Sequence, residues 1–187
     1  MSGFSLSSEP FTLQRDCEAV MVPVGETVTL PAGQIGYITQ ALGGSFTVYV
    51  EGNLFRIAGQ DADALGKQTP PPIELAEDAS DEDVEKLVWS QLRTCFDPEI
   101  PVNVVDLGLV YDVSLDHGEG ERDDRRVYVK MTLTAPGCGM GDILVDDVRT
   151  KLELIPTVAE ADVDLVFDPP WNQSMMSDVA KLETGML

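Results

Sequence analysis

The stretch Thr132-Leu133-Thr134-Ala135-Pro136-Gly137-Cys138-Gly139-Met140-Gly141-Asp142 changes from a strand pattern to a helix pattern. Alternation of apolar and polar residues ends at Thr134, a Pro-Gly turn follows, and helical spacing begins shortly after the cysteine. We therefore expect the Cys138 thiol at a helix N-terminus, where backbone N–H groups and the macrodipole favour a thiolate. The plain alternative is a small buried residue in a tight turn. Asp142 opposes the functional interpretation, because a nearby carboxylate raises the pKa of a thiol.

The composition excludes several classes of protein. The 187 residues include 12 Lys and Arg against 33 Asp and Glu, a formal net charge of -21 at pH 7. Such a surface repels phosphate backbones and anionic lipids, so we expect neither nucleic-acid nor membrane binding. The 3 cysteines form no Cys-x-x-Cys pair, which indicates a reducing compartment rather than a disulfide framework or zinc finger. Without a signal peptide or an apolar run long enough to span a bilayer, the sequence predicts a cytoplasmic protein.

The chain is predicted to contain two domains. Residues 1–66 hold short β-branched runs separated by turn residues, which favours a small β barrel or rolled sheet. Within them we expect a two-residue hairpin loop at Gly52-Asn53 and one helical turn ended by Gly66. Residues 67–79 are predicted to be a Pro-rich acidic linker, because consecutive prolines favour an extended chain. Residues 80–187 form the second domain.

The second domain is predicted as α-β-β-α-β-α, an α+β sandwich of helices on a small mixed sheet. Ser80 and the acidic residue three positions later resemble a capping box, and the helix they begin carries Cys95 on its apolar stripe. Period-two alternation predicts strands at 109–116, 127–134 and 161–167. A second helix follows Cys138 and ends at Pro156, and a last helix carries Met175, Met176, Val179 and Leu182 before its cap, Gly185.

The order of these elements predicts where three distant segments meet. The second strand, the helix after it and the third strand form a βαβ unit, so the two strands should run parallel. The first strand is the antiparallel hairpin partner of the second, so its beginning lies at the same end of the sheet. Residues 97–106, 134–138 and 168–171 should therefore come together, and ligands commonly bind at such carboxyl ends.

These segments contain further candidate side chains. Four carboxylates could ligate a metal or polarise a partner, although two of them precede proline, where Asx turns are ordinary; they are Asp97, Glu99, Asp106 and Asp168. Asn103 and Thr134 could donate hydrogen bonds across the site, or could simply cap strand ends. Trp171 is expected to be a packing lid over the end of the sheet, with partner contact as the alternative. The one histidine, His117, falls in the hairpin tip, which argues against a Cys–His hydrolase.

The same segments resemble a known family. Residues 97–111, Asp-Pro-Glu-Ile-Pro-Val-Asn-Val-Val-Asp-Leu-Gly-Leu-Val-Tyr, look like the signature of the metal–sulfur cluster biosynthesis domain. That domain is shared by PaaD, the bacterial SufT proteins and the eukaryotic cytosolic iron–sulfur targeting factors. Residues 132–138 and 167–171 resemble its other two hallmarks. In the first domain, residues 15–17, 29–33, 42–44 and 55–59 are similar to the N-terminal extension of the SufT proteins.

The resemblance implies a non-catalytic factor that assists the maturation of iron–sulfur proteins, with Cys138 as the functional thiol. Some relatives have proline directly after this cysteine, whereas this chain has Gly139. Its expected partners are the iron–sulfur assembly machinery and client iron–sulfur proteins. One thiol cannot supply the four thiolates that hold a cluster. Stable binding of iron or a cluster would need a homodimer, further ligands such as Asp97 or Glu99, or a client's cysteines.

Three hypotheses follow. The first is an iron–sulfur maturation factor in which Cys138 transiently ligates iron or a cluster. The second is a metal-free, client-binding adaptor that docks partners through its acidic surface and the Trp171 region. The third is a thiol-dependent enzyme with Cys138 as a nucleophile, which ranks last because no histidine is expected near the thiol.

Overall fold

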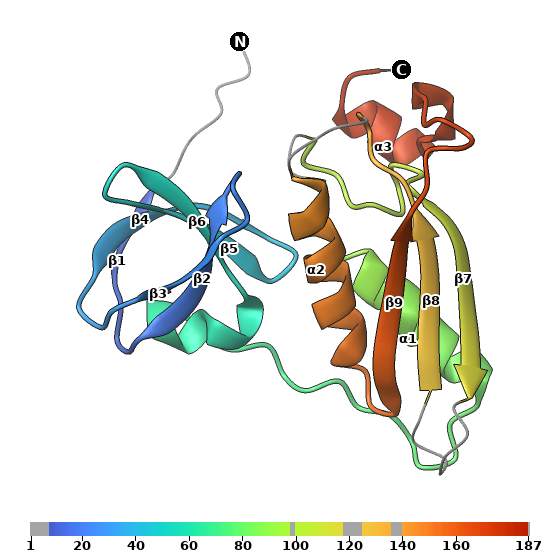
Figure 1. Ribbon diagram of the computed structural model, residues 1–187, viewed down its shortest axis with the longest axis horizontal. Coiled ribbons are helices and arrows are strands. Elements are labelled where there is room, and N and C mark those ends of the chain that lie inside the picture. Colours follow the sequence, from blue (N-terminus) through green and yellow to red (C-terminus); the bar gives the residue numbers. More distant parts are fainter. Residues whose placement is uncertain (1–7, 98–99, 118–124, 136–139, 187) are drawn as a thin grey trace. The chain divides into compact units, whose positions relative to one another are not determined.

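The computed structural model describes residues 8–97, 100–117, 125–135 and 140–186 (Figure 1). The chain divides into two compact units, Met1–Pro71 and Pro72–Leu187, and the division falls within the expected linker. The fold is α+β, with one large antiparallel sheet and one three-stranded sheet.

The net charge is divided unequally between the two units. The first unit has 3 basic and 7 acidic residues, a net charge of -4, whereas the second has 9 and 26, a net charge of -17.

Unit 1 is a six-stranded antiparallel sheet in the order β1-β4-β5-β6-β2-β3. Its strands are β1 (Glu9–Thr12), β2 (Cys17–Val22), β3 (Thr27–Leu30), β4 (Ile35–Leu42), β5 (Ser45–Val50) and β6 (Asn53–Ile57). Figure 1 shows the sheet curling around one of its faces. That face holds the core, in which Leu13, Val48 and Ile57 are almost fully buried.

The β5–β6 hairpin differs from the prediction by one residue. Val50 pairs with Asn53, so the two-residue loop is Glu51-Gly52 rather than Gly52-Asn53. Both loop residues have positive φ, 48° and 89°, as a type I′ turn requires. Asn53 therefore belongs to the strand, and glutamate occupies a left-handed position more typical of asparagine or glycine.

A short 3₁₀ helix, η1 (Gly59–Leu65), ends at Gly66, whose φ of 72° gives the left-handed cap expected there. The Arg15 guanidinium donates to the carboxylates of Asp61 and Asp63, at 2.9 and 2.6 Å. Asp16 accepts from the backbone N–H of Ala32 at 2.8 Å. The Arg15-Asp16 pair thus anchors η1 and the turn after β3, which gives these residues a structural role.

Unit 2 contains the sheet order β7-β8-β9, formed by β7 (Val110–His117), β8 (Arg125–Met131) and β9 (Val158–Leu165). The β7–β8 pair is antiparallel and the β8–β9 pair is parallel, which confirms the predicted topology. Helices α1 (Asp81–Leu92) and α2 (Gly141–Glu153) pack with the inward-facing side chains of β8 into one core. Ile73 and Leu75 also pack there, so the linker is not wholly solvated. No helix in the described ranges is long and apolar enough to cross a membrane.

The boundaries of α1 are set by local chemistry. Ser80 accepts from Asp83 N–H and Asp83 accepts from Ser80 N–H, which is the predicted capping box. The helix ends at Leu92, however, so Cys95 lies beyond it. Cys95 is fully buried in the core, in a turn in which its N–H donates to Leu92 O, so the prediction that it lies on the helix is wrong.

The C-terminal elements are shorter than predicted. β8 and β9 end at Met131 and Leu165, before the expected residues 134 and 167. A 3₁₀ turn, η2 (Gln173–Met175), precedes α3 (Asp178–Glu183), and Gly185 caps the end with a φ of 71° as expected. Val179 and Leu182 are 58% and 68% exposed, so the predicted apolar face of this helix is not buried. Met176 and Ala180 face the core instead.

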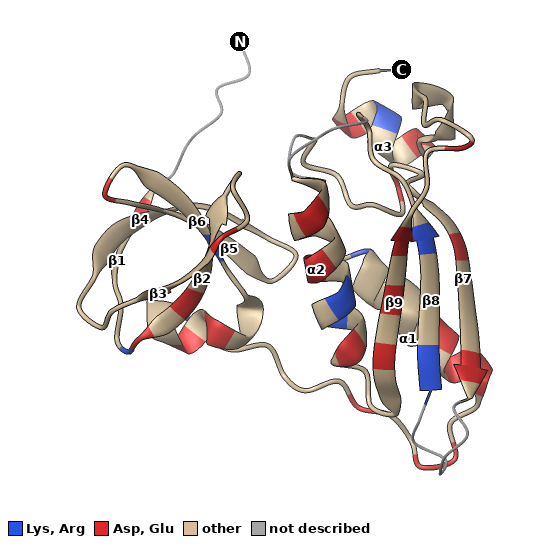
Figure 2. Ribbon diagram, viewed as in Figure 1, with Lys and Arg blue, Asp and Glu red and all other residues tan. Residues whose placement is uncertain are grey.

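The outward face of the three-stranded sheet carries alternating charges. Acidic residues on β7 and β9 flank basic residues on β8, as the colours of the ribbon in Figure 2 show. The cross-strand rows are Asp116–Arg126–Glu160 and Asp112–Lys130–Asp164. Arg126 and Lys130, the outward-facing basic residues of β8, therefore each have a carboxylate on both neighbouring strands, which favours the pairing of the strands.

Candidate functional site

The first hallmark segment folds into a loop held by its own side chains. Asp97 is largely buried, and its Oδ1 accepts from the backbone N–H of Ile100 at 3.0 Å. The Asp97 N–H donates to Val102 O, and Phe96 forms an isolated bridge with Asn103. The carboxylate therefore closes a turn of the kind that an aspartate before proline ordinarily makes. Pro98 and Glu99 lie outside the described residues.

Asn103 organises the second half of this loop. Its Oδ1 accepts from the backbone N–H groups of Val105 and Asp106, at 3.1 and 2.9 Å. Its Nδ2 donates to Asp106 Oδ2 at 2.6 Å. Asn103 and Asp106 thus bind each other and the loop backbone, an arrangement like a helix cap.

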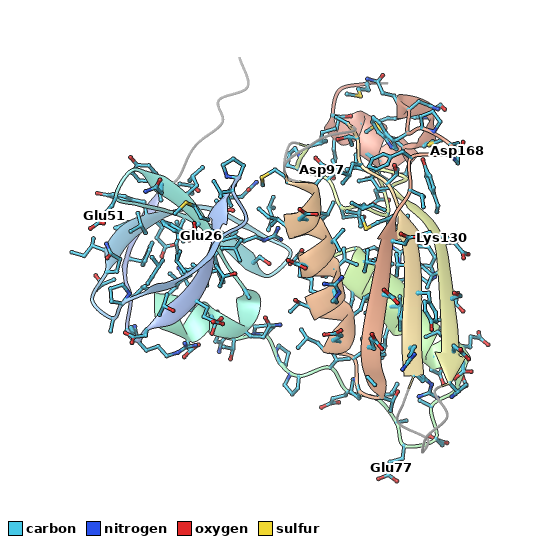
Figure 3. The ribbon with its side chains drawn as sticks, in the orientation of Figure 1. Glu26, Glu51, Glu77, Asp97, Lys130 and Asp168 are labelled. Carbon is cyan, nitrogen blue, oxygen red and sulfur yellow. The ribbon has the colours of Figure 1, made fainter. Side chains whose placement is uncertain are left out.

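The first and third predicted segments meet. Trp171 Nε1 donates to Leu107 O at 2.7 Å, and Tyr111 Oη donates to Pro169 O at 2.7 Å. The Ser177 N–H donates to Asp106 O at 2.7 Å. Trp171 is half-buried against the core, in keeping with a packing lid. These bonds join residues 106–111 to residues 169–177, so the two predicted segments meet where the first one ends. Figure 3 labels Asp97 and Asp168 at this end of the sheet.

Gly108 makes this close approach possible. Its φ is 75°, and a side chain at this position would overlap the carbonyl of Met175 and lie 2.9 Å from Met175 Cβ. The backbone of the 103–109 loop therefore lies directly against η2. Gly108 was not among the candidates taken from the sequence, although it lies within the family signature at residues 97–111 and could have been found there.

The second segment is described only in part. The Thr132 N–H donates to Leu109 O at 2.8 Å, so the chain leaving β8 is bonded to the first segment. Thr134 is partly buried and follows β8 by three residues. Cys138 lies outside the described residues, while α2 begins at Gly141, where an added Cβ would lie 2.8 Å from Leu133 Cδ1. The start of α2 is therefore packed against the end of β8.

Thr132 is a polar residue that sequence reasoning missed as a candidate. It is 1% exposed, and its Oγ1 has no hydrogen-bond partner among the described residues. A buried hydroxyl without a partner costs free energy, so it stands out among the polar groups of the site. The expectation that β8 continues to Thr134 concealed it, because Thr132 then counted as an ordinary strand residue.

An open hollow of about 720 Å³ lies beside the junction of the two bonded segments. Lys130 and Asp168 contribute its charged groups (Figure 3), while Tyr111 and Met175 contribute an aromatic ring and a thioether. Among the described residues, no three His, Cys, Asp or Glu side chains are grouped so as to hold a metal ion.

The other two cysteines are unsuited to ligation. Cys17 is buried, and desolvation raises the pKa of its thiol to about 11. Cys95 is fully enclosed in the unit 2 core. His117 lies at the opposite end of the sheet, where its Nε2 is 2.8 Å from Asp81 Oδ2. It is therefore remote from Ala135 and Met140, the described residues nearest to Cys138 in sequence.

Comparisons with known proteins identify the family. A family model described as "Iron-sulfur cluster assembly protein" matches residues 85–163. The chain is 48% identical, over 55% of its own length and 92% of the relative's, to an "Fe-S protein maturation auxiliary factor" of Porphyromonas gingivalis. It is 42% identical, over 48% of its own length and 96% of the relative's, to the "Fe-S protein maturation auxiliary factor SufT" of Staphylococcus aureus.

A solved structure agrees with the sequence comparisons. The crystal structure of a domain of unknown function from Bacillus anthracis is 37% identical, with a TM-score of 0.50 over 57% of this chain and 95% of that one. About half of this chain thus covers each of these proteins almost end to end. Because the family model lies within unit 2, the resemblance of unit 1 to an N-terminal extension stays a prediction. Through its second unit, the chain belongs to the iron–sulfur cluster assembly protein family.

Proposed function

We propose that this chain is an auxiliary factor in the maturation of iron–sulfur proteins, with the Cys138 thiol as a transient or shared ligand of iron or a cluster. The metal or cluster is cargo in this scheme, and the chain performs no catalysis. The observation that carries the proposal is the convergence of the family's hallmark segments at the end of the sheet where α2 begins.

The position of Cys138 in the sequence suits this role. It precedes Gly141, the first residue of α2, by three positions. Groups at the N-terminus of a helix favour negative charge, which would stabilise the thiolate that binds iron. Soft thiolates also match the ligand preference of iron–sulfur clusters.

The rest of the ligand set would come largely from outside the chain. Cys17 and Cys95 are buried away from solvent, so neither is proposed as the exchanging thiol, and the proposal rests on Cys138. Three further ligands are needed for a cluster. Asp97 and Glu99 are the proposed local contributors, and client cysteines or a second copy of the chain would complete the set. Shared ligation of this kind suits transfer, because thiolates of the client can replace the ligands of the factor on the iron one at a time.

Anaerobic reconstitution with iron and sulfide tests the role of the thiol. We expect wild-type protein to retain iron and acid-labile sulfide after desalting, and Cys138→Ser to lose most of both. Cys17→Ala is the matched control, because it removes a buried thiol from unit 1 and should load like wild type. Equal loading of wild type and Cys138→Ser would contradict the proposal.

The carboxylates need a variant that keeps the fold. Asp97→Asn retains an oxygen that can accept from the Ile100 N–H, but removes the charge. A loss of iron in Asp97→Asn, with no change in the urea midpoint, would support Asp97 as a ligand. Asp168→Asn serves as the comparison, since it removes a carboxylate from the neighbouring hollow. Equal iron content in Asp97→Asn and wild type would show that Asp97 only holds the loop together and does not ligate iron.

The exposed apolar side chains near the C-terminus favour a second candidate, a metal-free adaptor. Phe167, Val179 and Leu182 are each exposed in unit 2, where partners could cover them. An adaptor would retain the same client iron–sulfur proteins in a pull-down with Cys138→Ala, and would lose them in the double variant Val179→Ser/Leu182→Ser. The proposed ligand role predicts the opposite result for clients held through a shared cluster: Cys138→Ala should lose them, and Val179→Ser/Leu182→Ser should retain them.

A further inference from the structure

A continuous row of apolar side chains crosses the outer face of unit 1. Pro10 pairs with Tyr37, Tyr37 with Tyr49, Tyr49 with Leu54, and Leu54 with Val22. Residues directly opposite one another in antiparallel strands project to the same face. The row therefore runs over five adjacent strands, β1, β4, β5, β6 and β2, and contains no charged residue.

The row lies on the solvent side of the sheet. Tyr37, Tyr49 and Leu54 are 48%, 44% and 39% exposed. The neighbouring cross-strand row, Ile38, Val48 and Phe55, is buried in the unit 1 core. Because successive residues of a strand point to opposite faces, the two rows lie on opposite sides of the sheet.

The dimensions of the row limit what can cover it. Five strands span four gaps of about 4.8 Å, or about 19 Å. The row is one side chain wide except at β4, where the exposed Ile35 lies beside Tyr37 on the same face. Its apolar surface is thus a few hundred Å², well below the roughly 800 Å² that each partner buries in a stable protein dimer. The shape matches an extended chain of about six residues at roughly 3.1 Å per residue.

The chemistry of the row narrows the occupant further. Tyrosine rings give flat apolar faces for proline rings, and their hydroxyls can donate to the free carbonyls of a polyproline II segment. Such segments bind aromatic-lined surfaces because little conformational entropy is lost. Unit 1, which carries the row, has a net charge of -4, so it disfavours acidic peptides. We propose that the Pro10–Tyr37–Tyr49–Leu54–Val22 row binds an extended, proline-containing segment of a partner protein that is uncharged or basic.

The test is an NMR and calorimetric titration of the full-length chain with the acetylated, amidated peptide Pro-Pro-Leu-Pro-Pro-Leu-Pro. We expect a Kd on the order of 10⁻⁴ M, as for a short peptide, with shift changes centred on the row. The double variant Tyr37→Ala/Tyr49→Ala should weaken binding at least about tenfold. Tyr49→Phe should retain most of the affinity, because the ring remains. Circular dichroism verifies that the variants keep the native sheet.

Two controls make the result specific. Tyr128→Ala removes an exposed tyrosine from unit 2 and should leave binding unchanged, and a Gly-Ser peptide of equal length should not bind. Absence of binding to wild type, or equal binding to wild type and the double variant, would overturn the proposal. So would a doubling of mass in light scattering that the double variant abolishes, since the row would then join two copies. This inference is independent of the proposed iron–sulfur role.

Discussion

Substitution of Gly108 by alanine tests how tightly the two hallmark segments are joined. Gly108 has a φ of 75°, and an added methyl group would overlap the carbonyl of Met175. Relief of that overlap requires the 168–177 segment to move away from the 103–109 loop. Such a movement would strain the hydrogen bonds from Trp171 Nε1 to Leu107 O and from Ser177 N to Asp106 O.

The expected loss of stability combines two effects. The left-handed conformation costs about 1 kcal/mol for alanine relative to glycine. The two strained hydrogen bonds are worth about 1 kcal/mol each. We therefore expect Gly108→Ala to lower the free energy of unfolding of unit 2 by about 2–4 kcal/mol.

Urea denaturation followed by tryptophan fluorescence measures this loss, because Trp89 and Trp171 both lie in unit 2. Gly185→Ala is the matched control. Gly185 has nearly the same φ, 71°, and no atom lies within 4 Å of an added Cβ. It should therefore lose only about 1 kcal/mol or less. Equal losses in the two variants would refute the claim that the close contact with Met175, rather than the dihedral angle, makes glycine necessary.

Three further outcomes are expected. Ser80→Ala removes the capping acceptor of α1 and should lower the free energy of unfolding by about 1 kcal/mol in the same urea assay, and an unchanged midpoint would refute the cap. Hydrogen bonds from His117 and Arg125 hold the pKa of Asp81 below its usual 3.8. The stability that Asp81 adds over Asp81→Asn should therefore be complete above pH 4 and fall as the pH drops through the lowered pKa. An advantage that grows on acidification would contradict this. Iodoacetamide at pH 8 should leave Cys17 unmodified until urea is added, because burial raises the pKa of its thiol to about 11; alkylation of the native protein at the rate of a free thiol would show otherwise.

Local chemistry and handedness made much of unit 2 predictable. Ser80 and Gly185 fix helix ends through contacts within a few residues, so their signals are complete in the sequence. The parallel pairing of β8 and β9 followed from the crossover through α2, which also predicted that residues 97–106 and 168–171 meet. These inferences needed only short-range patterns and a general rule of chain topology.

Features that depend on distant contacts were not predictable in this way. The apolar spacing of Val179 and Leu182 suggested a buried face, but only tertiary packing decides which side of a short helix is covered. Strand β4 carries a bulge between Ile38 and Gln40, which breaks the alternation that identifies a strand. The roles of Asn103 and Trp171 as hydrogen-bonding partners within and between loops also required coordinates.

The rows of alternating charge in unit 2 bear on its solubility. β7 and β9 are the edge strands of the sheet, and their outward side chains are largely acidic, with Asp112 on one and Asp164 on the other. An exposed edge is a template for uncontrolled pairing with another chain, and charged side chains are a common protection against it. Two copies that approach edge to edge would place carboxylates opposite one another. The basic residues stay on the central strand, where they hold the sheet together without offering a complementary edge, so the same pattern that stabilises the native sheet resists aggregation.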